Sequence, residues 1–402
     1  MKIGIIREGK NPPDKRVPLS PEICSKLVEN YPDVVIIVQP SPIRAFTDSE
    51  YEERGFEINE DLSDCDLLMG VKEVPMDMLI PDKKYLFFSH TFKKQPYNRA
   101  LLRTILDKRI QLIDYEVLTD DRGVRVIGFG RYAGIVGAYN ALLAAGKKWG
   151  LFNLKPAHNC DGRKEVEEEL KKIDLPANFK ICMTGAGRVA GGAIEILEQA
   201  GIKQVSPEEY LKSEFEYPVY TQLSVEDYNA KKDGSEFNKS EFYEHPERFK
   251  SNFMPYARVT ALYIPCHYWD SRAPFIFSRV DAKSPDFNIK VVADISCDID
   301  GPVASTVRAS TIAAPLYGYD PITEEETDFM DPNAIGVMSV DNLPCELPKD
   351  ASHDFGTELL NKVIPELLKP HSDMIKRASE TDLTGQLTPH FDYLQGYADG
   401  IE

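Results

Sequence analysis

The sequence predicts an α/β protein with two doubly wound parallel-sheet domains. Three observations support this prediction. The chain has 402 residues, which is too long for one small core. Short apolar runs alternate with helical patterns through the first 130 residues. A second series of this kind begins near residue 179, where an apolar run leads into a glycine-rich turn.

The strands of the first domain are predicted from mainly apolar runs, as strands buried on both faces of a parallel sheet are. These runs cover residues 2–7, 34–39, 65–71, 85–88 and 110–116. Ser20 followed by Pro21 predicts a helix start, because serine caps free N–H groups and proline fits the first helical position. Residues 97–108 carry leucine and isoleucine at helical spacing. The tail from residue 370 onward is expected to pack back on this domain.

The second domain is predicted from a strand, a glycine turn and a helix in direct succession. Residues 179–184 are apolar and run into Gly185-x-Gly187-x-x-Ala190, and a helix follows through residue 198. Glycines permit a tight turn and let backbone N–H groups approach a pyrophosphate at the positive end of the helix. This pattern predicts a Rossmann-like dinucleotide site, with Gly185, Gly187, Arg188 and Val189 at the phosphates.

The identity of the dinucleotide stays open between NAD and NADP. An acidic residue about 20 positions after the glycine turn would bind the ribose hydroxyls of NAD. The strand at 202–206 instead places Ser206 there, near Lys203 and Arg188. Residues 211–257 are polar and interrupted, which indicates an insertion. The later apolar run at 291–298 contains Asp294, a candidate contact to cofactor or substrate, and no metal site is expected because the acidic spacing lacks a calcium-loop pattern.

Two ionisable residues stand where successive strands of the first domain end. Lys72 follows the run at 65–71, and His90 follows the run at 85–88. Ligands of open α/β sheets bind beyond the carboxyl ends of the strands, so these residues form a candidate acid/base pair. Arg16 lies beyond the end of the first strand and is a candidate clamp for a carboxylate. Each of the three could instead be an ordinary surface residue or a hydrogen-bonded loop residue.

The composition favours a small charged metabolite as partner. The net charge is −18, with 65 acidic against 47 basic residues, which leaves little basic surface for nucleic acid. No run is as apolar and long as a membrane helix, and the N-terminus has the pattern of a strand and not of a signal peptide. The seven cysteines form no CxxC motif, which favours free thiols. We expect a cytoplasmic protein, either monomer or homo-oligomer.

Taken together, the Lys72 and His90 strand ends and the glycine turn belong to a chain that resembles the saccharopine dehydrogenases of the alanine dehydrogenase and transhydrogenase-like group. It is more similar still to the lysine-ketoglutarate reductase part of the bifunctional lysine-degrading enzymes. The resemblance runs nearly end to end and is carried by short blocks in order, at 16–21 (RVPLSP), 70–72 (GVK), 87–91 (FFSHT), 112–116 (LIDYE), 123–126 (GVRV), 245–249 (HPERF), 294–296 (DIS) and 339–344 (SVDNLP).

The resemblance implies a domain organisation and a set of roles. Residues 1–130, completed by about 340–402, would form the catalytic domain, and 131–339 the Rossmann domain, with the site in a cleft between them. Lys72 would be the catalytic base and His90 its partner acid. The remaining roles would fall on Arg16, Gln95, Glu116, Arg125 and Phe129 around the substrate, and on Gly187, Arg188, Asp294 and Asp341 near NAD or NADP.

The implied reaction suits the charged residues. Saccharopine is a secondary amine with three carboxylates, so several arginines are expected around its site. Hydride transfer from it requires a neutral amine, which a lysine of lowered pKa can produce near neutral pH. Two rival functions stay open at this stage: an amino-acid dehydrogenase of the alanine type, and a non-catalytic nucleotide-binding module.

Overall fold

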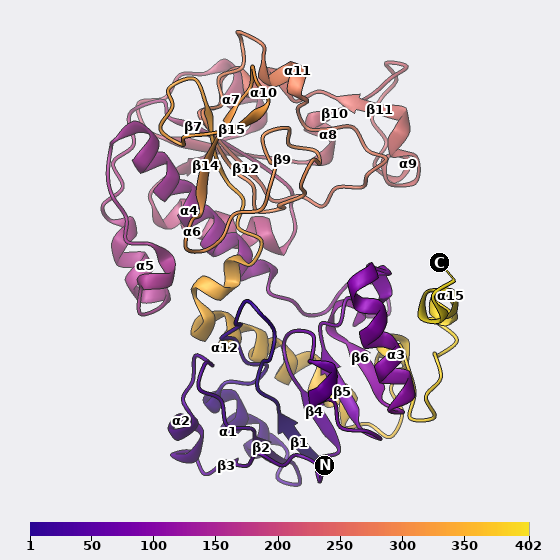
Figure 1. The fold of residues 1–402 in the computed structure, drawn as a ribbon. Coiled ribbons are helices and arrows are strands. Elements are labelled where there is room, and N and C mark those ends of the chain that lie inside the picture. Colours follow the sequence, from indigo (N-terminus) through magenta and orange to yellow (C-terminus); the bar gives the residue numbers. More distant parts are fainter. Residues whose placement is uncertain (402) are drawn as a thin grey trace. The chain divides into compact units, whose positions relative to one another are not determined.

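The computed structural model describes residues 1–401, and the chain divides into two compact units (Figure 1). The first unit comprises Met1–Phe129 together with the chain from Pro348 onward, and the second comprises Gly130–Leu347. The boundaries predicted from the sequence lie at residue 130 and near residue 340.

The first unit is built on a six-stranded sheet in the order β3-β2-β1-β4-β5-β6, with every neighbouring pair parallel. The chain starts in the middle of the sheet, winds outward to one edge and then to the other, which is the doubly wound arrangement predicted. The strands are β1 (Lys2–Ile5), β2 (Val35–Val38), β3 (Glu57–Ile58), β4 (Leu67–Met69), β5 (Lys84–Phe87) and β6 (Gln111–Asp114).

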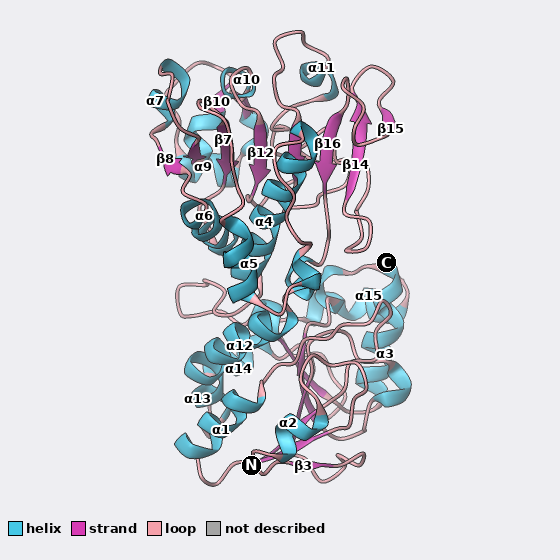
Figure 2. Cartoon of the chain, turned by 90° about the vertical axis from the view of Figure 1, so that its left-hand side faces the viewer, coloured by secondary structure: helices cyan, strands magenta, loops and turns pink. Residues whose placement is uncertain are grey.

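Helices cover both faces of this sheet. Figure 2 shows α1, α12, α13 and α14 on one side and α3 and α15 on the other. Ser20 caps α1 and Pro21 is its first residue, as predicted. The helices of the unit are α1 (Pro21–Asn30), α2 (Asp48–Glu52), α3 (Arg99–Asp107), α12 (Pro348–Glu358), α13 (Ile364–Leu367), α14 (Asp373–Ala378) and α15 (Gln395–Asp399), with a π-helical turn at Leu359–Val363.

The C-terminal tail is tied to the edge of the sheet beside β6. The Glu380 N–H donates to Leu112 O over 2.8 Å, and the Leu112 N–H donates to Thr381 Oγ1 over 3.0 Å. These bonds satisfy backbone groups that an edge strand would otherwise leave open. The tail therefore completes the first unit.

The tail also delivers a second carboxyl group into a buried acidic cluster. Ser89 Oγ donates to Asp114 Oδ2 over 2.6 Å and lies 3.2 Å from Glu380 Oε1, while Thr91 Oγ1 donates to Glu380 Oε2 over 2.6 Å. Burial, together with the nearby Asp114 carboxyl, raises the pKa of Glu380 to about 8. One proton is thus kept on the pair near neutral pH.

This cluster predicts a pH-dependent stability. Because the pKa of Glu380 is raised on folding, the folded state holds a proton that the unfolded chain releases above its ordinary pKa. The free energy of unfolding should therefore fall as the pH rises toward about 8. In Glu380→Gln, whose amide can replace the protonated carboxyl, we expect that fall to shrink by at least about 1.4 kcal/mol between pH 5 and pH 8. Chemical denaturation at the two pH values measures it.

The matched control for this prediction is Glu52→Gln, which changes an exposed glutamate of α2 in the same unit. Its pH dependence should follow that of the wild type. Equal pH slopes for Glu380→Gln and the wild type would show that no proton is held on the cluster.

The second unit is built on an eight-stranded sheet in the order β15-β14-β16-β13-β12-β7-β9-β8. The six strands from β16 to β8 are parallel, and β14 and β15 add an antiparallel hairpin at one edge. The strands are β7 (Lys180–Thr184), β8 (Lys203–Gln204), β9 (Val219–Leu223), β12 (Leu262–Pro265), β13 (Val291–Ala293), β14 (Leu316–Asp320), β15 (Glu325–Thr327) and β16 (Ile335–Met338).

The helices of the second unit include a tightly packed pair, α4 and α6. A Cβ on Gly192 would come within 1.9 Å of Arg131 O, and one on Gly134 within 1.8 Å of Val189 O. Glycine at these positions lets the two backbones touch. The helices are α4 (Gly130–Trp149), α5 (Arg163–Leu170), α6 (Arg188–Gln199), α7 (Pro207–Lys212), α8 (Val225–Tyr228), α9 (Lys239–Glu244), α10 (Met254–Ala257) and α11 (Arg279–Ala282).

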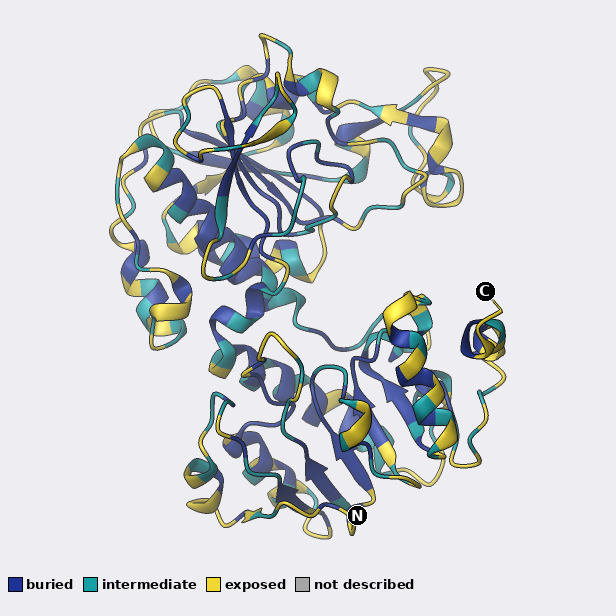
Figure 3. Ribbon diagram, viewed as in Figure 1, coloured by how far each residue is buried: buried dark blue, intermediate teal, exposed yellow. Residues whose placement is uncertain are grey.

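The predicted insertion at 211–257 needs a correction. Val219–Leu223 lies within it but forms β9, which pairs directly with β7 in the sheet. Only the part after β9 leaves the sheet, where β10 (Asn229–Lys231) and β11 (Phe249–Ser251) form a separate antiparallel pair. The strand was missed because its short run is flanked by polar residues. Figure 3 shows the inner strands of both sheets buried. The edge strands β8 and β15 are largely exposed.

Candidate active site and cofactor pocket

Lys72 and His90 follow neighbouring strands of the first unit. Strands β4 and β5 pair in parallel with Met69 opposite Leu86, and the pairing continues as the Phe88 N–H donates to Val71 O over 3.0 Å. The chain then turns at His90, whose backbone takes the left-handed conformation with φ of 56°. The sequence prediction placed both residues at strand ends, and the structure puts these ends side by side.

Glu73 bridges His90 and Lys10. One carboxylate oxygen lies 2.7 Å from His90 Nδ1, and the other accepts a 2.6 Å bond from Lys10 Nζ. Burial alone would raise the pKa of Glu73, but the bonds from His90 and Lys10 lower it to about 2. An ionised Glu73 can only accept, so Nδ1 of His90 carries the hydrogen and Nε2 is the nitrogen able to exchange a proton.

Glu116 faces the other edge of the His90 ring. Its carboxylate lies 3.6 Å from His90 Nε2, 2.9 Å from Lys93 Nζ and 3.5 Å from Arg125 Nη1. The Arg125 side chain is half-exposed and its guanidinium lies over the ring of Phe88 at 5.5 Å. Glu116 and Arg125, both predicted to line the substrate, therefore belong to the same cluster as His90.

Glu8 holds the backbone at Lys72. Its two carboxylate oxygens accept the N–H groups of Val71 over 2.6 Å and of Lys72 over 2.9 Å. Burial raises the pKa of Glu8 to about 7. Burial, with the positive charge of Arg16 nearby, lowers the pKa of Lys72. A lysine in this setting can lose its proton closer to neutral pH than a solvated lysine.

Arg16 is paired inside the protein. Its Nε and Nη2 donate to the two oxygens of Asp14 over 3.0 and 2.6 Å, and both side chains are buried. Although burial alone would raise the pKa of Asp14, the Arg16 guanidinium holds it well below its usual range. Arg16 also lies over the ring of Phe129 at 4.2 Å, and Phe129 stacks on Phe355. Two of the guanidinium donors that a substrate clamp would offer are thus engaged by Asp14.

The structure leaves Gln95 apart from this cluster. Gln95 is exposed, and its backbone oxygen accepts a bond from Tyr397 of the C-terminal tail. The residues that sequence reasoning did not single out are Glu8, Lys10, Asp14, Glu73 and Lys93. A signal existed for two of them: Glu8 follows the first strand, and Glu73 follows Lys72 directly.

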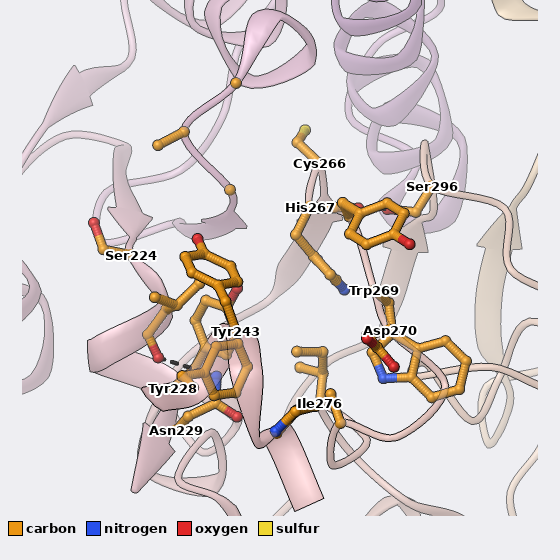
Figure 4. A pocket seen from close by; sticks show the side chains of 18 of the residues that line it. Ser224, Tyr228, Asn229, Tyr243, Cys266, His267, Trp269, Asp270, Ile276 and Ser296 are labelled. Atoms are coloured by element: carbon orange, nitrogen blue, oxygen red, sulfur yellow. Dashed lines mark hydrogen bonds between the residues drawn. The ribbon is translucent and has the colours of Figure 1, made fainter. Parts of the chain in front are cut away.

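The second unit has a cavity of about 800 Å³ at the carboxyl ends of β7, β9 and β12. It lies where the chain order reverses about β7, which is where ligands of such sheets bind. Gly185, Gly187, Arg188 and Val189, which the sequence predicts to hold cofactor phosphates, line this cavity. Figure 4 shows further lining side chains, including Ser224, Tyr228, Tyr243, Cys266, His267, Trp269 and Ser296.

The glycine turn is shaped for a dinucleotide. Gly185 has φ of 104°, a region that side chains disfavour, and a Cβ there would meet Cys266 O at 2.5 Å. Apart from Gly187 itself and its two chain neighbours, no heavy atom of residues 1–401 is found within 4 Å of the position that a Cβ would take on Gly187, at the start of α6. Backbone and helix end are therefore open to a phosphate.

Three residues predicted to contact the cofactor do not line the cavity. Ser206 is exposed and caps α7 by bonding Glu209, because the strand beside β7 is β9 and not β8. The residue after β9, Ser224, lines the cavity instead. Asp294 lies outside the lining and is buried, where it accepts bonds from Thr306 Oγ1 and the Ser296 and Cys297 N–H groups; burial raises its pKa to about 6. Asp341 is exposed and also lies outside the lining.

Comparison with known proteins gives a family match and several relatives. Residues 4–136 match the model of the N-terminal domain of alanine dehydrogenase/PNT. The α-aminoadipic semialdehyde synthase of Arabidopsis thaliana is 32% identical over 98% of this chain and 41% of the plant protein, and that of Mus musculus is 30% identical over 97% and 47%. The chain thus spans less than half the length of these two relatives. Saccharopine dehydrogenase [NAD(+), L-lysine-forming] of Neurospora crassa is 26% identical over 87% of both chains.

Solved structures show the same fold. An L-alanine dehydrogenase aligns with a TM-score of 0.65 and 15% identity over 100% of both chains. The transhydrogenase from Sinorhizobium meliloti aligns with a TM-score of 0.58 and 13% identity over 96% of this chain and 99% of its own. The fold is therefore that of the alanine dehydrogenase and transhydrogenase structures. In sequence, the chain is similar over at least 87% of its length to a saccharopine dehydrogenase and to part of the α-aminoadipic semialdehyde synthases.

The helices were compared with the length and apolar character of a membrane span. None of those formed by residues 1–401 combines the length and the apolar character needed to cross a bilayer.

Proposed function

We propose that the protein interconverts saccharopine with L-lysine and 2-oxoglutarate, using NAD or NADP as hydride carrier. The observation that supports this most directly is the cluster of Lys72, Glu73, His90 and Glu116 at the strand ends of the first unit. The sequence similarity to saccharopine dehydrogenases and α-aminoadipic semialdehyde synthases supports the substrate class.

Lys72 acts as the base in the oxidative direction. Its lowered pKa favours the neutral amine, which accepts a proton from the secondary ammonium of saccharopine. The freed nitrogen lone pair then assists loss of hydride from the adjacent carbon. A bound nicotinamide dinucleotide supplies the acceptor for that hydride. The glycine turn at Gly185–Gly187 and the start of α6 would hold its phosphates.

His90 serves the hydrolysis that follows. Loss of hydride leaves a C=N bond, to which water adds at carbon. His90 Nε2 takes a proton from the adding water and gives it to the nitrogen of the lysine part. As the C–N bond breaks and the C=O bond forms, Nε2 takes the remaining hydroxyl proton. Glu73 keeps Nδ1 protonated throughout, so that the exchange runs through Nε2. The products are lysine and 2-oxoglutarate.

The charges near the pair suit a substrate with three carboxylates. Arg125 and Lys93 both face Glu116 and are partly exposed. A substrate carboxylate can take the place of Glu116 on one of these cations or bind beside it. Arg16, held by Asp14, adds positive charge next to Lys72.

The proposed function is tested by following the absorbance of the reduced cofactor. Purified protein receives lysine and 2-oxoglutarate, with NADH and NADPH offered in turn. We expect oxidation of at least one cofactor only when both substrates are present, and a product with the mass of saccharopine. Parallel reactions replace lysine by ammonia, and 2-oxoglutarate by pyruvate. Equal turnover with ammonia would favour the alanine type of dehydrogenase and contradict the proposal.

A further inference from the structure

A histidine in the cavity of the second unit takes no part in the chemistry above. His267 follows β12, lines the cavity and is only 9% exposed. Its Nε2 is buried and has no hydrogen-bond partner among residues 1–401. Figure 4 shows the side chain between Tyr228 and Tyr243 on one side and Trp269 on the other. An unpartnered buried nitrogen in a cavity points to a ligand atom.

The hydrogen-bond network determines which ring nitrogen carries the hydrogen. His267 Nδ1 lies 2.8 Å from Thr184 Oγ1, and that oxygen lies 2.8 Å from Tyr263 Oη. Thr184 and Tyr263 are fully buried, and Thr184 is the one hydrogen-bond partner of the Tyr263 hydroxyl within residues 1–401. Tyr263 must therefore donate to Thr184, and Thr184 to Nδ1. Any other arrangement leaves a buried O–H without an acceptor.

The ring is consequently a neutral donor. With Nδ1 accepting, the hydrogen is on Nε2, the nitrogen turned away from Thr184. Burial lowers the pKa of His267 to about 4, so the ring stays uncharged near neutral pH. A neutral N–H donor suits an oxygen acceptor and adds no charge to the pocket.

The position of His267 indicates which part of a dinucleotide it meets. A Cβ on Gly185 would lie 2.5 Å from Cys266 O and 3.0 Å from His267 N, so this peptide packs directly against the glycine turn. The glycine turn and the start of α6 are where a pyrophosphate binds. The His267 side chain extends into the cavity from the same place.

We propose that His267 Nε2 donates a hydrogen bond to an oxygen of the ADP-ribose part of the bound dinucleotide, with Thr184 and Tyr263 as positioning residues. This rests on the proposed function only in requiring that a nicotinamide dinucleotide occupies the cavity. Saccharopine turnover is not needed, so direct binding measurements test it separately.

The experiment measures the dissociation constants of NADH, NADPH and ADP-ribose by titration calorimetry. His267→Leu should weaken the better-bound reduced cofactor and ADP-ribose each by about tenfold. His267→Gln should stay within about threefold of the wild type, because its amide nitrogen offers a donor at similar reach. His390→Leu, at an exposed histidine of the first unit, is the matched control and should bind like the wild type.

Each remaining outcome decides the proposal. Binding by His267→Leu within twofold of the wild type would overturn it, as would a loss seen with the reduced cofactor but not with ADP-ribose. A wild type that binds none of the three nucleotides would overturn it too. If His267→Leu does not fold, His267→Asn replaces it: its shorter amide cannot reach the Nε2 position, so it should bind about tenfold more weakly than His267→Gln. Equal binding by these two amides would contradict the assignment.

The positioning role has its own measurement. Thr184→Val removes the hydroxyl that orients the ring and should weaken ADP-ribose binding several-fold in the wild-type background. In the His267→Leu background the same change should have no further effect, because there is no ring left to orient. Additive losses would indicate that Thr184 acts only through packing.

Discussion

Replacing Lys72 by methionine should lower kcat for saccharopine oxidation by at least about 100-fold, since a positioned acid or base contributes about 10²–10⁴-fold. Methionine keeps a long apolar chain but cannot accept a proton. In the wild type, kcat/KM should rise with pH through a pKa below the usual lysine value of about 10.4, because burial and Arg16 lower the pKa of Lys72. That rise should be absent from Lys72→Met. Steady-state kinetics from pH 6 to pH 10 measures both.

The control for this variant is Lys26→Met, which changes an exposed lysine of α1 paired with Glu22. It should retain wild-type kinetics. A Lys72→Met enzyme with wild-type kcat would remove Lys72 from the mechanism. If Lys72→Met binds the cofactor like the wild type, the variant is folded and its loss of activity comes from the missing base.

Replacing Asp14 by alanine should cost about 3–5 kcal/mol of stability, because it removes the carboxylate that forms a buried ion pair with Arg16. Arg16 is only 3% exposed and cannot regain hydration without local unfolding. The loss should appear as a lower midpoint in chemical denaturation of the full chain. Phe129, whose ring lies beneath the Arg16 guanidinium, should lose part of its contact as well.

The double variant Asp14→Ala/Arg16→Met distinguishes a charge effect from a packing effect. Removing both charges should recover a large part of the lost stability, because an apolar pair needs no hydration. A double variant as unstable as the sum of the two single variants would mean that the pair stabilises by packing and not by charge compensation.

Local sequence patterns were enough to find the strand ends and the glycine turn. The run before Lys72 and the run before His90 each signal a buried strand, and a parallel sheet brings such ends to one edge. Ser20 and Pro21 marked the start of α1, because a helix cap depends only on near neighbours in the chain. The contacts of Glu73 and Glu8 required the structure, because they join segments 17 to 64 residues apart.

The prediction for Ser206 was wrong because the order of strands in the sheet differs from their order in the chain. The prediction assumed that the next strand in sequence lies next to the glycine-turn strand. In the structure β9 takes that place and β8 lies outside it, so that Ser224 lines the cavity and Ser206 caps a helix. Strand neighbours are chosen by long-range pairing of backbone and side chains, which a single sequence does not display.

The sequence by itself determined the fold class, the position of the glycine turn and the two residues proposed for acid/base work, because each depends on short-range patterns of apolar, glycine and polar residues. Only the tertiary structure decided which groups surround them. It buried Asp14 against Arg16, placed Glu73 beside His90, and left His267 Nε2 with no hydrogen-bond partner among the residues that the structure describes. The physical reason is that burial and charge pairing arise between distant segments, and these set both the protonation state and the orientation of a side chain.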